Sequence, residues 1–140
     1  IRDSIYIMDI ITREEFTMGY SADIAKDQNK IFLSTTMTGN LQLLRLEHIG
    51  YFRYNSRSNQ WEAVLCNQHT LMLKRSTNSQ KILSYHPCFI QVNQSFIVNV
   101  SYLDQIRDKR CVLLPPFDGM ETLRISTPFM RKLKEKYPSI

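Results

Sequence analysis

Side chains that could act as general bases or metal ligands are few and far apart in this chain. The three histidines, His48, His69 and His86, are scattered, and no H-E-x-x-H, G-x-S-x-G or glycine-rich phosphate-binding motif occurs. No carboxylate pair stands in a recognisable site context. We therefore expect a protein that is not an enzyme, and we expect each histidine to be a surface or strand residue rather than a ligand.

The cysteines also lack a pattern that would indicate a site. Cys66, Cys88 and Cys111 are odd in number, lie far apart and include no C-x-x-C pair. We expect buried thiols in a reducing cytosol, with no disulfide framework, no zinc and no other cofactor.

The ends and hydropathy of the chain predict a cytoplasmic location. No stretch approaches the roughly twenty apolar residues that span a bilayer, and the N-terminal sequence lacks the layout of a signal peptide. No membrane association is therefore expected. Because the sequence begins at Ile1 rather than Met, we expect it to be a piece of a longer protein.

The chemistry that the composition does favour is binding of a polyanion. Residues 1–30 hold four basic and six acidic side chains, whereas residues 31–140 hold fourteen basic and seven acidic ones. Such a surplus attracts nucleic acid or an anionic membrane through its phosphates and through counterion release. A merely soluble basic protein explains the same surplus, so composition alone leaves both readings open.

The densest group of cations lies in a predicted C-terminal helix. Ser126 or Thr127 can cap this helix, and Pro128 fits its first position. Apolar residues recur on one face and cations occupy the others: Phe129, Met130, Leu133 and Tyr137 against Arg131, Lys132, Lys134 and Lys136. The cations indicate either phosphate contacts or a solvated face, because lysines near a helix C-terminus also suit the macrodipole.

The elements before this helix are predicted to be short strands. Apolar runs recur about every ten residues and are separated by polar turn-formers, a layout typical of an all-β domain. The predicted strands are Ile31–Thr36, Leu41–Leu46, Ile49–Tyr54, Trp61–Cys66, Thr70–Arg75, Phe89–Val92, Phe96–Val100, Leu103–Arg107, Cys111–Leu114 and Thr122–Ser126. Gly39-Asn40 is expected to turn the first two into a hairpin, and residues 76–84 to hold one or two helical turns.

The first thirty residues are expected to be a linker or an appended element. Ile5 and Ile7 alternate like a strand, whereas Thr12 and Glu15 have the spacing of a capping box. The domain itself is expected to span residues 31–140.

Three segments of the chain have residue types and spacings that match a known domain family. Residues 88–103 read Cys-Phe-Ile-Gln-Val-Asn-Gln-Ser-Phe-Ile-Val-Asn-Val-Ser-Tyr-Leu. This segment resembles the LytTR family of DNA-binding domains, which runs aromatic-aromatic-Arg-apolar-His-Arg/Asn-Ser-aromatic-apolar-Val-Asn, and the spacing matches without a gap. Residues 125–133 are similar to the stretch that starts the family's terminal helix, and residues 46–52 resemble its opening pattern.

The resemblance implies a mainly β fold of stacked small antiparallel sheets with a short C-terminal helix. It also implies double-stranded DNA binding by loops that enter successive major grooves, in the output domain of a bacterial two-component transcription regulator. An upstream receiver domain, a sensor kinase and two copies on repeated half-sites are the implied partners. The implied DNA-binding residues are Arg57, Asn59, Asn93, Gln94, Ser95, Ser126, Arg131, Lys132 and Lys134.

Four positions depart from the family pattern. Gln91, Asn93 and Gln94 stand where the family places Arg, His and Arg or Asn, and Pro128 stands where an Arg often precedes the final helix. Asn and Gln pair bidentately with adenine, but a lost Arg–guanine pair forgoes roughly 1–3 kcal/mol of discrimination. The alternative function is therefore a protein-interaction or dimerisation module that has lost base reading, with residues 1–30 in its interface.

Several of these residues also have a structural reading. Turn chemistry alone favours Asn59, and Asn93-Gln94-Ser95 would serve as a capped turn between strands, with Ser95 satisfying backbone N–H groups. Asn99 is expected to form backbone hydrogen bonds inside the fold. The strand-spaced residues Phe89, Phe96, Ile97 and Val98 are expected to lie in the core.

Overall fold

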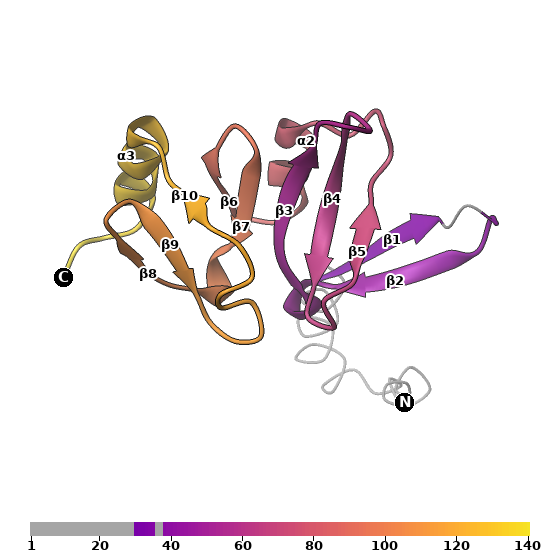
Figure 1. Ribbon diagram of the computed structural model, residues 1–140, viewed down its shortest axis with the longest axis horizontal. Helices are drawn as coiled ribbons and strands as arrows, with labels where there is room; N and C mark the ends of the chain where they lie inside the picture. Colours follow the sequence, from indigo (N-terminus) through magenta and orange to yellow (C-terminus); the bar gives the residue numbers. More distant parts are fainter. Residues whose placement is uncertain (1–29, 36–37) are drawn as a thin grey trace, which may run out of the picture.

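The computed structural model describes residues 30–35 and 38–140. The predicted linker or appended element lies outside the described residues, apart from Lys30. The described chain forms three antiparallel sheets that are stacked along the long axis of the molecule (Figure 1). This is the predicted mainly β arrangement of small stacked sheets.

The first sheet is a two-stranded hairpin, the second has five strands, and the third has three. The hairpin joins β1 (Ile31–Thr35) to β2 (Leu41–Arg45). The central sheet has the order β5-β4-β3-β7-β6, and its strands are β3 (Ile49–Asn55), β4 (Gln60–Leu65), β5 (Thr70–Met72), β6 (Phe89–Asn93) and β7 (Phe96–Asn99). The third sheet has the order β10-β9-β8, with β8 (Leu103–Arg107), β9 (Arg110–Leu113) and β10 (Leu123–Arg124).

Two α-helices and two 3-10 turns complete the described part of the chain. α2 (Ser79–Tyr85) begins after Asn78, whose side-chain oxygen accepts a hydrogen bond from Lys81 N at 2.8 Å. α3 (Thr127–Lys136) closes the fold beside the third sheet (Figure 1). The 3-10 turns, η2 (Leu46–His48) and η3 (Val100–Tyr102), lead into β3 and β8. No described helix is long and apolar enough to cross a bilayer.

The central sheet has a separate hydrophobic core on each face. The α2-side core lies toward the hairpin and α2 and consists of Leu44, Leu46, Ile49, Phe52, Trp61, Ala63, Leu65, Ile82, Phe89 and Ile97. The α3-side core lies toward the third sheet and α3 and consists of Tyr51, Val64, Val92, Val98, Cys111, Leu113, Phe117, Leu123 and Ile125. Because successive strand residues point to opposite faces, Tyr51 and Phe52 enter different cores.

Asn99 has the internal role that the sequence predicts. Its side chain is completely buried, and its Nδ2 donates to the backbone oxygens of Leu46 at 3.2 Å and Ile49 at 2.9 Å. Its Oδ1 accepts from Ser101 N at 3.0 Å. A buried amide with these partners ties the end of β7 to the start of β3.

Gly50 allows the aromatic ring of Phe117 to lie against the backbone of β3. A Cβ atom at this position would lie 2.3 Å from Phe117 Cε1, far inside van der Waals contact. Phe117 is itself buried and makes edge contacts with the rings of Tyr51 and Tyr102. The loop between β9 and β10 is thereby anchored in the α3-side core.

Most predicted elements are confirmed, and a few boundaries are wrong. The hairpin and all ten predicted strands are present, but β5 ends at Met72 rather than Arg75, and β10 is confined to Leu123–Arg124. β10 is short because it pairs only with Cys111 and Arg110. Phe89, Ile97 and Val98 are buried as predicted, and Phe96 is partly buried against the α3-side core.

Two smaller predictions also need correction. Cys111 is buried, but Cys66 and Cys88 are only partly so, because they lie at strand ends rather than inside a core. Ser126 occupies the cap position of α3 without a side-chain capping hydrogen bond, and Pro128 is the second rather than the first helical residue.

Candidate nucleic-acid interface

Three chain segments meet at one end of the central sheet. They are the β3–β4 turn, the β6–β7 turn and the start of α3, all toward the top of Figure 1. Tyr54 N donates to Ser95 O at 2.8 Å, joining the two turns. Ser126 N donates to Val92 O at 2.9 Å, which joins the helix start to the end of β6. Segments that are far apart in sequence therefore form one continuous row.

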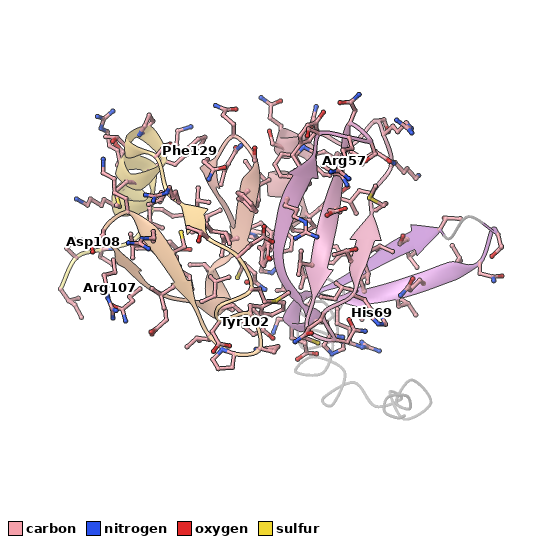
Figure 2. All side chains as sticks on the ribbon, viewed as in Figure 1. Arg57, His69, Tyr102, Arg107, Asp108 and Phe129 are labelled. Carbon is pink, nitrogen blue, oxygen red and sulfur yellow. The ribbon has the colours of Figure 1, made fainter. Side chains whose placement is uncertain are left out.

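The β3–β4 turn is shaped by two asparagines and exposes Arg57. Asn55 Oδ1 accepts from Arg57 N at 2.9 Å and from Ser58 N at 3.4 Å. Asn59 has a left-handed backbone with φ of 55°, and its Oδ1 accepts from the Tyr54 hydroxyl at 3.2 Å. Asn tolerates this conformation better than most residues, so turn chemistry accounts for Asn59. The Arg57 side chain lies in the upper part of the molecule (Figure 2).

The β6–β7 turn uses Asn93 internally and exposes Gln94 and Ser95. Asn93 Oδ1 accepts from Ser95 N at 2.7 Å, and Asn93 Nδ2 donates to Arg124 O at 2.6 Å. Gln91 Nε2 donates to Asn93 O at 3.0 Å. The turn-shaping side chain is thus Asn93 rather than Ser95. Gln94 is exposed at the tip.

α3 packs one face on the protein and exposes its four cations. Phe129, Met130 and Leu133 pack against the α3-side core, whereas the exposed cations are Arg131, Lys132, Lys134 and Lys136. Lys132 Nζ lies 5.2 Å from the centroid of the Phe129 ring, a cation–π contact. Lys136 Nζ donates to Pro87 O and is therefore used within the domain.

Comparison with known proteins identifies the family of this domain. The family model of the LytTR DNA-binding domain matches residues 39–137. The chain belongs to the LytTR DNA-binding domain family. A LytTR DNA-binding domain assigned to a methyl-accepting/DNA response regulator of Bacillus cereus has a similar fold, with a TM-score of 0.54 at 17% identity over 76% of this chain and 94% of that one. No curated protein matches the chain closely enough to extend the comparison.

Two further cations of the LytTR domain adjoin the row, and sequence reasoning missed both. Arg75 NH1 donates to Ser58 O at 2.8 Å, beside the β3–β4 turn. Lys109 Nζ donates to Thr127 Oγ1 at 3.0 Å, at the first residue of α3. The sequence predicted Arg75 to end a strand, and the contacts span 17 and 18 residues, so no local spacing signalled them.

A partly buried charge network braces β3 and β4 below the β3–β4 turn. Arg53 Nε lies 2.5 Å from Glu62 Oε2, and Arg53 NH1 lies 2.6 Å from Glu121 Oε2. The Tyr51 hydroxyl also donates to Glu121. Burial, followed by the hydrogen bond to Glu121, raises the pKa of Tyr51, so its hydroxyl remains a donor at neutral pH.

Arg53 forms the only ion pairs within residues 30–35 and 38–140. Although burial opposes its charge, the hydrogen bonds to Glu62 and Glu121 raise the pKa of Arg53. The exposed cations of the row form no ion pair with any described residue. Their charge is available to an external anion.

Replacing Asn93 tests whether its amide holds the row together. Asn93→Ala removes the hydrogen bonds to Ser95 N and Arg124 O, so we expect the free energy of unfolding to fall by about 1–2 kcal/mol. Urea denaturation measures the change. Gln94→Ala, at the exposed neighbour, should stay within about 0.5 kcal/mol of the wild type. Equal stabilities of the two variants would contradict this role.

Proposed function

We propose that this LytTR domain binds duplex DNA sequence-specifically as the output domain of a bacterial two-component transcription regulator. The observation that carries the proposal is the hydrogen-bonded row of two turns and a helix start, along which exposed cations form no ion pair with any described residue. Hydrogen-bonded turns that project from one end of a sheet suit entry into DNA grooves. Membership of the LytTR family supports the same function.

In this proposal the cations anchor the phosphates and the turns read the bases. Arg57, Arg131, Lys132 and Lys134 contact the backbone and set the register of the protein on the duplex. Of the base-reading candidates Asn59, Asn93 and Gln94, the last is the most available, because the side-chain amides of the other two have hydrogen-bond partners within the domain. Ser95 and Ser126 lie beside these turns, where their hydroxyls can donate to phosphate.

The wider assembly follows from the family's role in response regulators. We propose an upstream receiver domain, controlled by a sensor kinase, and two copies on repeated half-sites in the cytoplasm. Cooperation between two sites compensates for weak reading by a single domain, since each linked binding event raises the effective concentration for the next.

Selection from a random duplex pool tests the function directly. A DNA-reading domain should enrich one sequence, and the logarithm of its affinity should fall linearly with the logarithm of salt concentration. The slope gives the number of phosphates contacted, at about 0.9 per contact. Failure to enrich any sequence, with no binding even at low salt, would overturn the proposal.

Gln94 should contribute to base preference. Gln94→Ala is expected to relax the preference at one base-pair position of the selected site, at a cost of about 1–3 kcal/mol against the preferred base, because a bidentate amide pair is lost. Repeating the selection with the variant measures this. Ser84→Ala, at an exposed residue of α2, is the control and should select the wild-type sequence. If the Gln94→Ala variant keeps the base preference of the wild type, Gln94 does not read a base.

A second candidate function, a dimerisation module without base reading, is favoured by the hairpin. Leu33 and Leu43 lie opposite each other on β1 and β2 and are 67% and 60% exposed, and Leu41 on the same face is 69% exposed. An apolar sheet face of this kind is typical of an interaction surface. Self-association of the wild type that Leu43→Lys abolishes, without any DNA binding, would select this function.

A further inference from the structure

Three arginines lie side by side across the third sheet. Arg107 is opposite Arg110 in the register of β8 and β9, and Arg110 is opposite Arg124 in that of β9 and β10. Directly opposite residues share one face of a sheet, with Cβ atoms about 4.5–5.5 Å apart. The neighbouring residues Cys111 and Leu123 point the other way and lie in the α3-side core. The three guanidinium groups, the arginine row, therefore share the outer face.

This alignment is unfavourable for the isolated domain. Like charges directly opposite each other destabilise a sheet. All three arginines are exposed, and none forms an ion pair with any residue in the described ranges. Asp104 and Asp108 are near in sequence but form no ion pair with them. The uncompensated repulsion points to an external anion as the partner of this face.

The arginine row adjoins the candidate DNA interface. Arg124 O accepts from Asn93 Nδ2 at 2.6 Å, and Ile125 N donates to Lys109 O at 3.0 Å. Lys109 lies in the β8–β9 turn between Arg107 and Arg110, and it also contacts the start of α3 through Thr127. Figure 2 shows Arg107 and Asp108 at the end of the molecule that carries α3, away from Arg57. The arginine row therefore adds positive charge beside the β6–β7 turn and the start of α3.

We propose that the arginine row binds the DNA phosphate backbone outside the base pairs that the turns read. This inference rests on the proposed function. Adjacent strands lie about 4.7–4.9 Å apart, so the row spans about 10 Å. Charges recur along one DNA strand about every 3.4 Å of helix axis, so two or three successive phosphates lie within reach. Guanidinium groups bind phosphate oxygens bidentately, which suits arginine in particular.

The test compares the wild-type chain with Arg107→Gln/Arg110→Gln/Arg124→Gln on the selected duplex with flanking base pairs. The variant should bind about tenfold or more weakly near physiological salt, and the magnitude of its salt slope should fall by about 2–3. Its base preference should remain that of the wild type. Its melting temperature should equal or exceed that of the wild type, because like-charge pairs are removed.

Controls separate this site from the reading turns and from folding defects. Arg45→Gln, at the exposed last residue of β2 in the first sheet, should leave the slope unchanged, and the single variant Arg110→Gln should lower it by about 1. On a duplex trimmed to the selected site, the wild type and the triple variant should bind equally.

Two negative outcomes are distinguishable. If the wild type binds DNA and the triple variant keeps its slope, the arginine row does not contact DNA, and an acidic protein becomes the partner to test. If the wild type binds no duplex, the proposed function fails and this inference fails with it. A lower melting temperature for the triple variant would contradict the argument from repulsion.

Discussion

Gly50→Ala should destabilise the domain by about 2–3 kcal/mol, although the substitution adds a single methyl group. The new Cβ would lie 2.3–2.5 Å from three atoms of the Phe117 ring. The ring cannot move aside freely, because it is buried and lies edge-on against Tyr51 and Tyr102. Guanidinium denaturation monitored by circular dichroism measures the loss.

A double-mutant cycle shows whether the ring is the cause. Phe117→Leu alone should destabilise by leaving a cavity, but it should relieve most of the clash in Gly50→Ala/Phe117→Leu. The double variant should then be more stable than the sum of the single effects predicts, by at least about 1 kcal/mol. Strictly additive effects would show that Gly50 is required for another reason.

Arg53→Met should also be strongly destabilising, by about 2–4 kcal/mol. Glu62 is only 6% exposed, and its carboxylate would keep just the 3.4 Å contact from Asn55 Nδ2 after the arginine is lost. Glu121 would lose a partner as well, so the loop before β10 would be held less firmly. Chemical denaturation at neutral pH measures the change.

The control for Arg53→Met also removes the charge of the Glu62 carboxylate. Arg53→Met/Glu62→Gln should recover a large part of the loss, because replacing both members of a partly buried pair is less costly than leaving the buried Glu62 carboxylate without its partner. Lys81→Met, at an exposed cation on α2, should have little effect. If the double variant is as unstable as Arg53→Met, the packing of the Arg53 stem rather than its charge stabilises the domain.

The fold was largely predictable because its strands are short apolar runs separated by polar turn-formers. β6 and β7 show this well: Val92 and Val98 enter the α3-side core, while Phe89 and Ile97 enter the α2-side core. The short β10 was overestimated because its length depends on pairing with β9, which no local pattern encodes. Propensity in a strand depends on such neighbours.

The residues of the candidate site could be predicted from the sequence, but the contacts that bring them together could not. The sequence indicated the polar turns at Asn59 and Asn93-Gln94 and the cations of α3. The contact from Asn93 to Arg124 joins residues 31 positions apart, and the arginine row exists only through the register of three strands. Long-range register follows from the packing of the whole sheet, so these features required the structure.

The two cores share one sheet, and this sharing governs how the domain unfolds. β3 contributes Phe52 to one core and Tyr51 to the other. If β3 unfolds, both cores therefore lose side chains at the same time. A slip of β3 by one residue would exchange these side chains between the cores, and such a shift is therefore strongly disfavoured. Despite its three sheets, the domain should unfold as one cooperative unit with a single transition.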